Sequence, residues 1–466
     1  MSALASFRDP DARLSIEGGK VIRTVRPGAV ERFARTLADP FIQSLLASGK
    51  LVGTRLAESE TGRAAGADAG AVEYEHDLIP FVTYPNEWSP AMLASAADFV
   101  LSLNLELLEH GYALKDATPA NVLFNATTPV LVDVPSIVPR QAGTYIWAAQ
   151  DQFERTFLLP LIANLEAGIP ISWSLEDPVR GIDHETLARV LGAGSWLKPS
   201  LLRSVVVPAM LTRRMSEGRH RSPEPMGRDR QAKFVLERSL RASLKKVRKL
   251  ALAIEKRSGS MWQEYTRTRS HYADADVADK HAFVARVLER VTPRWVLDVG
   301  ANTGEFSRAA ASVAKVVALD SDEAAANRIF FESGRDRSGV LPMVGDIARP
   351  TPGYGWHNEE TAAFLERAKG RFDLVLLLAV IHHLRATSGI PMERILDLAR
   401  ELTSDHVLIE HVPLSDPMFQ RLSRGRDELF ADAEKPAFEA ELERRFVIEM
   451  VRPLANGRTL YLAARR

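Results

Sequence analysis

A chain of 466 residues is too long for one typical hydrophobic core, so two domains are expected. Sixty basic residues balance sixty acidic ones and 46% of the residues are hydrophobic, a composition typical of soluble globular proteins and without a global charge that would attract nucleic acid or an anionic membrane. The chain has no cysteine, which excludes disulfides, thiolate nucleophiles and cysteine-based zinc sites.

The same features lead to expectations about location and partners. The N-terminus lacks the apolar run of a secretory signal, and the longest apolar run, residues 374–381, is less than half a membrane span. We therefore expect a cytoplasmic protein without a membrane partner, and nucleic acid is not the expected partner either. The oligomeric state is left open.

The first 215 residues show a mixture of short strands and longer helices, which predicts a helix-rich α+β domain over residues 1–215. A short Gly/Ala loop at residues 62–70 separates two of the extended segments. The expected strands cover residues 20–25, 51–57, 72–82, 122–124 and 130–134, and the expected helical stretches cover residues 29–47, 90–110 and 147–165.

A polar triplet lies in residues 112–135, YALKDATPANVLFNATTPVLVDVP. Asp116 and Asn121 flank a proline-containing loop, and Asp133 closes the second strand of a predicted hairpin, so the three side chains are expected at one mouth. In phosphoryl transfer such a triplet supplies the base for the substrate hydroxyl and two Mg²⁺ ligands. The segment resembles the catalytic loop and metal-binding aspartate of kinase-like folds, and the resemblance implies ATP and Mg²⁺.

The departures from the kinase pattern leave a second interpretation open. Leu114 stands where that family usually has histidine, and a Val-Pro pair follows Asp133 in place of Phe-Gly. Glycines at 18–19 are the only glycine pair near a strand start, and Lys20 or Arg23 would have to supply the phosphate-binding cation. In the alternative, Asp116 and Asn121 form turns and Asp133 caps a structural hydrogen-bond network. No metal site is certain.

Residues 216–260 are expected to form a linker followed by a basic helix. Residues 216–230 are rich in Pro, Gly and Arg, and apolar residues then recur at helical spacing up to about Lys256. Residues 213–257 hold fifteen basic and five acidic residues. They form either a solvated helix face or a surface for an anionic partner or substrate. The apolar positions are Phe234, Leu240, Leu244, Val247, Ala251 and Ile254.

From residue 290 onward strands alternate with helices, which is typical of a parallel sheet. The segment RWVLDVGANTGEFS (residues 294–307) predicts a strand at 295–299, a glycine turn and a helix from about Glu305. Gly300 and Gly304 allow a ligand to approach the turn, and Asn302 can take a positive φ.

Polar residues follow three more of the expected strands. Asp320 follows a strand at 316–319, 22 residues after Asp298, where a carboxylate can accept both hydroxyls of a ribose. Asp346 follows a strand at 341–344. The strand at 372–379 is apolar on both faces, ends at Ala379 and leads into VIHHL, as a central parallel strand would.

Residues 280–466 resemble class I S-adenosylmethionine-dependent methyltransferases. Asp298, Gly300 and Gly304 match the first motif of that family, with Asn302 in place of its middle glycine. The resemblance implies a doubly wound Rossmann-like α/β fold over residues 261–466, S-adenosyl-L-methionine as the cofactor, Asp320 at its ribose, Asp346 at its adenine amino group and Ala379 beside it. A nicotinamide enzyme would share the first two features, whereas Asp298 in the turn, the Gly-Asp at 345–346 and the histidine pair favour the methyl donor.

Methyl transfer to a hydroxyl requires a base that removes the proton. His382 and His383 follow the central strand, and we expect one of them, with His382 marginally preferred, to face the pocket while the other packs. His411, after the strand at 407–410, is a second candidate by the same position argument.

The run LKDATPANVLF at 114–124, PVLVDVPSI at 129–137, the Glu-Trp pair at 87–88 and NGRTLYL at 456–462 occur together in this chain. With these motifs, both halves together resemble bacterial methyltransferases similar to a nodulation-associated protein. The resemblance implies methyl transfer to oxygen or nitrogen of a small-molecule or carbohydrate-like acceptor, with the N-terminal domain as a substrate platform. Two alternatives remain: a bifunctional kinase-like methyltransferase, and a non-catalytic scaffold that binds the donor.

Overall fold

The computed structural model describes residues 3–6, 9–58, 70–215, 225–268 and 274–466. The Gly/Ala loop expected at 62–70 lies outside the described residues, apart from Gly70, as does most of the linker expected at 216–230. The chain forms two compact units. Unit 1 comprises Met1–Glu255 and Gly353–Thr361, and unit 2 comprises Lys256–Pro352 and Ala362–Arg466.

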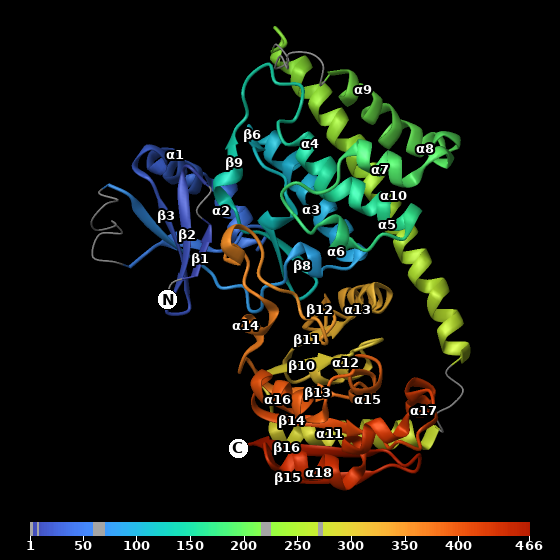
Figure 1. Cartoon of the computed structure of the whole chain (residues 1–466). Coiled ribbons are helices and arrows are strands. Elements are labelled where there is room, and N and C mark those ends of the chain that lie inside the picture. The colour runs from blue at the N-terminus through green and yellow to red at the C-terminus, as the bar shows by residue number, and fades with distance from the viewer. Residues whose placement is uncertain (1–2, 7–8, 59–69, 216–224, 269–273) are drawn as a thin grey trace. The chain divides into compact units, whose positions relative to one another are not determined.

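Unit 1 begins with a five-stranded antiparallel sheet in the order β1-β2-β3-β5-β4, drawn in blue in Figure 1. The strand at 20–25 is confirmed as β3, and β5 ends at His76, earlier than expected. The strands β1 and β2, which precede β3, were not predicted. Gly18 and Gly19 both have positive φ and connect β2 to β3 in a tight hairpin, which explains the glycine pair structurally. The strands are β1 Ala3–Ser6, β2 Ala12–Glu17, β3 Lys20–Val25, β4 Thr54–Leu56 and β5 Val72–His76.

The single helical stretch expected at 29–47 is wrong, because the structure has two helices there. α1 is Pro27–Ala38 and α2 is Pro40–Ala47. Asp39 between them is extended, as the residue before a proline prefers, and its side chain caps α2 by accepting the amide of Phe41 at 2.8 Å. α1 packs its buried residues Ala29 and Phe33 against the sheet.

The rest of unit 1 is mostly helical and is built around α3, Pro90–Glu109. Within the described residues α3 is the one helix whose length and composition would suit a membrane span, and 72% of its apolar window is buried inside the protein. A second group of helices follows it in the chain. They are α4 Gln150–Phe153, a π-helical turn Glu154–Leu158, α5 Leu159–Ala167, α6 Ile171–Ser174, α7 His184–Leu191, α8 Pro199–Leu201, a π-helical turn Leu202–Val206 and α9 Val207–Met215.

Two small pairs of antiparallel strands surround the polar triplet in the sequence. β7 (Val122–Asn125) and β8 (Thr128–Leu131) form the expected hairpin, although β8 stops three residues before the expected end and a 3₁₀ turn at Val134–Ser136 follows. β6 (Tyr112–Leu114) pairs with β9 (Ile137–Pro139). Asp133 therefore lies in the connection that follows β8.

α10, Asp229–Thr268, is the longest helix, and it starts earlier and ends later than the sequence pattern indicated. Leu240, Val247 and Ile254 are buried as expected. Phe234 is not: its side chain is 63% exposed, so its assignment to the apolar face is wrong.

Unit 2 holds a seven-stranded sheet in the order β12-β11-β10-β13-β14-β16-β15, with β16 antiparallel to its neighbours and the first five strands parallel. The chain moves outward from β10 in one direction and then from β13 in the other, which creates a topological switch point between them. The strands are β10 Trp295–Val299, β11 Lys315–Asp320, β12 Val340–Val344, β13 Phe372–Leu377, β14 Thr403–His411, β15 Phe446–Pro453 and β16 Thr459–Arg465.

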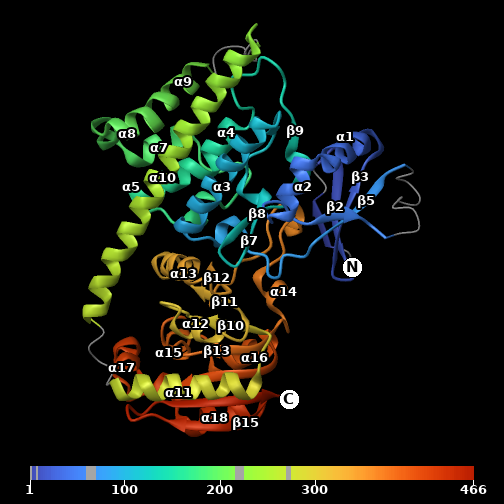
Figure 2. The same ribbon diagram turned by 180° about the vertical axis from the view of Figure 1, so that it is seen from behind.

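Helices pack on the sheet of unit 2, and Figure 2 shows them from behind. α11 (Asp274–Val291) shares a core cluster with the central strands through Phe283, Val287 and Leu288. This doubly wound α/β arrangement confirms the fold expected for the C-terminal half. The other helices are α12 Glu305–Ala311, α13 Glu323–Asp336, α14 Phe364–Ala368, α15 Ile381–Ala386, α16 Met392–Leu402, α17 Pro417–Ser423 and α18 Lys435–Glu443.

Candidate functional site

The carboxyl ends of β10 and β11 meet at the switch point of unit 2. Asp320, the last residue of β11, accepts the backbone amide of Asn302 through Oδ2 at 2.7 Å and the amide of Asp322 through Oδ1 at 2.9 Å. Burial raises the pKa of Asp320. Its carboxylate is therefore fixed in orientation by the turn of the neighbouring strand, and its remaining lone pairs can accept a pair of ligand hydroxyls.

The turn after β10 uses several of its own amides inside the protein. Gly300 and Ala301 donate to the carbonyl of Leu319 at 2.8 and 3.1 Å, Asn302 donates to Asp320, and Gly304 donates to the carbonyl of Ala301 at 2.8 Å. A dinucleotide needs free amides here for its pyrophosphate. A nucleoside without phosphates does not, so the turn fits the methyl donor better than a nicotinamide cofactor.

The backbone of this turn explains its residues. Gly300, Asn302 and Gly304 have φ values of 70°, 50° and 71°, in the region that favours glycine and tolerates asparagine. A Cβ at Gly304 would lie 2.8 Å from Cγ1 of Ile329. Ala379 also has a positive φ, 54°, which is rare for alanine and marks the point where the chain leaves β13.

Asp298 lies beneath the turn and is 2% exposed. Its Oδ2 accepts the hydroxyl of Ser307 in α12 at 2.6 Å. Burial is the main cause that raises the pKa of Asp298 to about 6; the charge of Asp320 acts in the same direction, and the Ser307 hydrogen bond and Lys280 oppose it. Asp298 therefore acts as a buried brace between β10 and α12 rather than as an exposed ligand.

Asp346 follows β12, at the third strand end of this edge. Its Oδ1 accepts the amide of Ala348 at 2.9 Å, and its Oδ2 is 3.1 Å from Nε of Arg349. The side chain thus shapes the turn after β12 and is half-buried, so one of its lone pairs remains available to a base amino group.

The histidine pair stands on the first turn of α15, and the two rings lie 4.2 Å apart. His382 is buried next to Phe419, and within the described residues its Nδ1 has no hydrogen-bond partner. Burial lowers the pKa of His382 to about 3, with smaller contributions from His383, Arg458 and Lys280. His383 is accessible to solvent, although partial burial of its ring and the charge of Arg458 lower its pKa. Both rings are therefore neutral near pH 7.

The structure argues against His411 as a base. Its Nε2 donates to the carbonyl of Ala433 at 2.9 Å, its ring packs on Phe438 and the residue is 1% exposed. Burial lowers the pKa of His411. β14 runs one residue further than expected and includes His411, whose side chain is buried, whereas the neighbouring Glu410 points to the opposite face of the strand.

A buried ionic network that the sequence analysis did not single out lies beside the histidine pair. Glu410 is 1% exposed, and its two oxygens contact Nζ of Lys280 at 2.5 Å and Nη1 of Arg458 at 3.2 Å. Nε of Arg458 also contacts Asp416, the N-cap of α17, at 2.8 Å. Lys280 in turn lies 5.1 Å from the ring centroid of Phe306, next to the donor turn. The signal that could have identified Glu410 is the one used for Asp298 and Asp320: an acid near the carboxyl end of a parallel strand.

In unit 1 Asp133 forms an ion pair with an arginine, whereas a metal site would need its carboxylate free for the ion. Nη1 of Arg23 in β3 lies 3.2 Å from Oδ1 of Asp133. Burial is the largest cause that raises the pKa of Asp133, and the charge of the nearby Asp116 acts in the same direction. Asn121 holds the loop by accepting the amide of Val132 on its backbone carbonyl at 2.9 Å. Asp133 thus pairs with Arg23 and lies near Asp116, whereas Lys20 pairs with Glu75.

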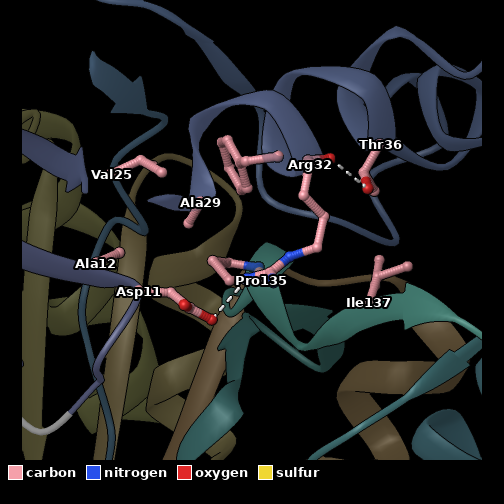
Figure 3. A pocket seen from close by; sticks show the side chains of 9 residues that line it. Asp11, Ala12, Val25, Ala29, Arg32, Thr36, Pro135 and Ile137 are labelled. Carbon is pink, nitrogen blue, oxygen red and sulfur yellow. Dashed lines mark hydrogen bonds and ion pairs between the residues drawn. The ribbon is translucent and has the colours of Figure 1, made fainter. Parts of the chain in front are cut away.

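The surroundings of this triplet bear on whether it could form a metal-binding site. In the part of the chain that the structure describes, no three His, Asp or Glu side chains are grouped so that they could hold a metal ion. A nearby cavity of about 10 Å³ is lined by Asp11, Arg32, Thr36 and Pro135 among others, and Figure 3 shows the ion pair of 2.7 Å between Arg32 and Asp11 at its edge. It has room for about one water molecule.

Comparisons of the sequence with known proteins identify relatives of this chain. A family model described as a methyltransferase domain matches residues 269–445. Nodulation protein NoeA of Rhizobium meliloti (strain 1021) is 30% identical over 462 residues, which cover 98% of this chain and 94% of NoeA. The match to NoeA therefore spans both units.

Solved structures resemble part of the chain. The N-methyltransferase NodS from Bradyrhizobium japonicum WM9 is 15% identical with a TM-score of 0.30, over 41% of this chain and 97% of NodS. The bifunctional kinase-methyltransferase WbdD is 22% identical with a TM-score of 0.30, over 40% of this chain and 38% of WbdD.

Proposed function

Because the chain belongs to the family of nodulation protein NoeA and its second unit is a class I S-adenosylmethionine-dependent methyltransferase domain, we propose that it methylates oxygen or nitrogen of a small-molecule or carbohydrate-like acceptor. The observation that carries the proposal is the contact of 2.7 Å between the amide of Asn302 and Oδ2 of Asp320. This contact joins two strand ends at the switch point and holds a carboxylate where a nucleoside ribose would bind.

We assign donor binding to the turn and strand ends of unit 2. Asp320 would accept the ribose hydroxyls, Asp346 would meet the adenine amino group, and Gly300, Asn302, Gly304 and Ala379 would shape the backbone around the nucleoside. Asp298 would support this turn from below through Ser307. S-adenosylmethionine supplies a methyl group already activated by the sulfonium sulfur.

The remaining chemical task of the protein is to align the acceptor and remove its proton. We assign proton removal to the pair His382 and His383, because both rings are neutral near pH 7 and lie directly after β13. Of the two, His383 is accessible to an acceptor, whereas the buried His382 can hold the His383 ring in place. We therefore assign the base to His383, although the sequence marginally favoured His382. His411 is not part of the proposal.

Unit 1 is proposed as a kinase-like platform for the acceptor rather than as a second enzyme. The alternative of a bifunctional protein requires ATP and Mg²⁺ at Asp116, Asn121 and Asp133. The ion pair between Arg23 and Asp133 weighs against this alternative, because it occupies a carboxylate that a metal would need. A second alternative is a donor-binding scaffold without turnover.

The decisive experiment is calorimetry on the purified full chain, followed by transfer of labelled methyl from S-adenosylmethionine to a panel of sugars and small metabolites. We expect binding of both S-adenosylmethionine and S-adenosylhomocysteine, and product with at least one acceptor. Binding of neither nucleoside would refute the proposal. Binding without product over a broad panel would favour the scaffold.

A further inference from the structure

α10 carries a second, exposed line of residues opposite its buried face (yellow-green in Figure 1). The buried face consists of Ala232, Leu236, Leu240, Val247 and Ile254. The exposed line is a set of six residues that share one orientation and include the misassigned Phe234. These residues, which we call the basic line, are Phe234, Arg238, Arg241, Lys245, Lys249 and Leu252.

The spacing of the basic line makes it straight. Successive members are three or four residues apart, so at 3.6 residues per turn they stack along one side of the helix. From Phe234 to Leu252 the line extends about 27 Å, at about 1.5 Å per residue. Its two ends are large apolar side chains in water: Phe234 is 63% exposed and Leu252 is 58% exposed.

The four central residues of the line are all cations. Within the described residues none of them forms an ion pair with a carboxylate, whereas cations elsewhere on α10 do: Lys233 contacts Glu237 at 3.7 Å and Arg248 contacts Asp98 at 2.6 Å. The line itself contains no acid. The charge of the whole chain is zero, so this concentration of one sign is local and is invisible in the composition.

We propose that the basic line docks unit 1 on the surface of an anionic phospholipid bilayer. The cations would meet headgroup phosphates, and Phe234 and Leu252 would enter the interfacial layer at the two ends of the line. This differs from the expectation of no membrane partner, which rested on net charge and on the absence of a spanning run. Neither bears on a helix that lies along a surface.

A bilayer suits the basic line better than a nucleic acid does. Both would attract the four cations, but nucleic acid offers no partner for the aliphatic Leu252, while the interfacial layer accepts it together with the aromatic Phe234. With only two apolar contacts, binding is expected to be reversible and to depend mainly on charge. It should therefore weaken sharply with salt.

Vesicle sedimentation of the full chain tests the proposal. We expect binding to phosphatidylcholine vesicles that contain about 30% phosphatidylglycerol, no binding to pure phosphatidylcholine vesicles, and loss of binding when salt rises from about 50 to about 500 mM. A labelled single-stranded RNA and a DNA duplex serve as competing probes. Absence of binding to the anionic vesicles, or tighter binding to either nucleic acid, would overturn the proposal.

Two sets of variants locate the contact. Arg241→Glu/Lys245→Glu reverses the centre of the line and should lower the vesicle partition coefficient at least tenfold, and Phe234→Ser should lower it by a smaller factor. The matched control is Arg189→Glu/Arg203→Glu, which makes the same change in charge at two exposed positions of unit 1 outside α10. Circular dichroism confirms that each variant is folded. Equal loss in the control and in the line variant would contradict docking through α10.

Discussion

The buried Arg23 and the partly exposed Asp133 form an ion pair in which Nη1 and Oδ1 are 3.2 Å apart. Nε of Arg23 also donates to Nε2 of His76 at 2.9 Å, and Nδ1 of that ring contacts the hydroxyl of Thr54 at 2.8 Å. Burial, together with the smaller effect of the Arg23 charge, lowers the pKa of His76 to about 3, so the ring stays neutral and accepts from the guanidinium. The network joins the five-stranded sheet to the connection after β8. It bears on whether Asp133 is a metal ligand of a kinase-like site or part of a structural hydrogen-bond network.

The first prediction concerns nucleotide binding by unit 1. Because Arg23 occupies Asp133, we expect ATP with Mg²⁺ to leave the melting temperature of the full chain unchanged within about 1 °C, since a ligand stabilises only by binding the folded state. Differential scanning fluorimetry measures this, with S-adenosylhomocysteine as the positive control. A Mg²⁺-dependent shift that Asp133→Ala abolishes would restore the bifunctional alternative.

The second prediction concerns the stability that the network confers. Arg23→Gln removes the ion pair with Asp133 and should lower the free energy of unfolding by about 2 kcal/mol, less than for a fully buried pair because the Asp133 side chain is 22% exposed to water. Lys20→Gln is the matched control on the same strand, because Lys20 is 58% exposed and its contact with Glu75 is 3.4 Å. The control should cost less than about 1 kcal/mol. Urea denaturation of both variants checks the difference, and equal costs would show that the pair is not a stabilising element.

The methyltransferase half could be predicted from sequence because its central strands are buried on both faces. Apolar runs at β10, β11 and β13, interrupted in β10 only by Asp298, lead to polar or glycine residues, and the carboxyl ends of parallel strands share one edge. Asp298, Asp320 and the turn between them followed from this pattern. The strand expected to end at Ala379 stops two residues earlier, at Leu377, and the positive φ of Ala379 could not be foreseen.

The parts that escaped prediction depend on tertiary packing or on single residues. The break at Asp39 was signalled by Pro40 but was outweighed by the apolar periodicity around it. Phe234 has helical spacing from the apolar residues that follow it, so the sequence pattern did not distinguish an exposed from a buried position. Glu410 and His411 are neighbours on one strand and point to opposite faces, and only tertiary packing gives Glu410 its partners Lys280 and Arg458.

The third prediction tests the ribose carboxylate. Asp320→Ala removes the acceptor for the hydroxyls and the brace for the amide of Asn302, so the affinity for S-adenosylhomocysteine should fall at least tenfold, or about 1.4 kcal/mol. Asp322→Asn is the control, because asparagine can keep the N-cap of α13 through its side-chain oxygen. Calorimetry compares the two. Unchanged affinity in Asp320→Ala would remove this residue from the donor site.

The fourth prediction separates the two histidines. If the acceptor is a hydroxyl, His383→Ala should lower the single-turnover rate of methyl transfer by about 100-fold or more while donor affinity stays within about twofold, because only proton removal is lost. His382→Ala should instead lower the melting temperature, since it leaves a cavity beside Phe419. Rapid-quench measurements with labelled donor check the rates. Full rates in both variants with intact donor binding would show that neither histidine is the base.

The last prediction uses the raised pKa of Asp298. In the folded protein this pKa is about 6, above the ordinary value of 3.8, so its contribution to stability is greatest below the unfolded pKa and is lost as pH rises through about 6. An asparagine side chain cannot ionise and can still accept the hydroxyl of Ser307, so Asp298→Asn avoids this loss. The stability advantage of the variant over the natural chain should therefore grow by about 1 to 1.5 kcal/mol between pH 5 and pH 8. Urea denaturation at both pH values measures the change, with Asp336→Asn as an exposed control whose difference should stay flat. An advantage that does not grow with pH would mean that Asp298 ionises normally and is not the buried brace inferred from its position.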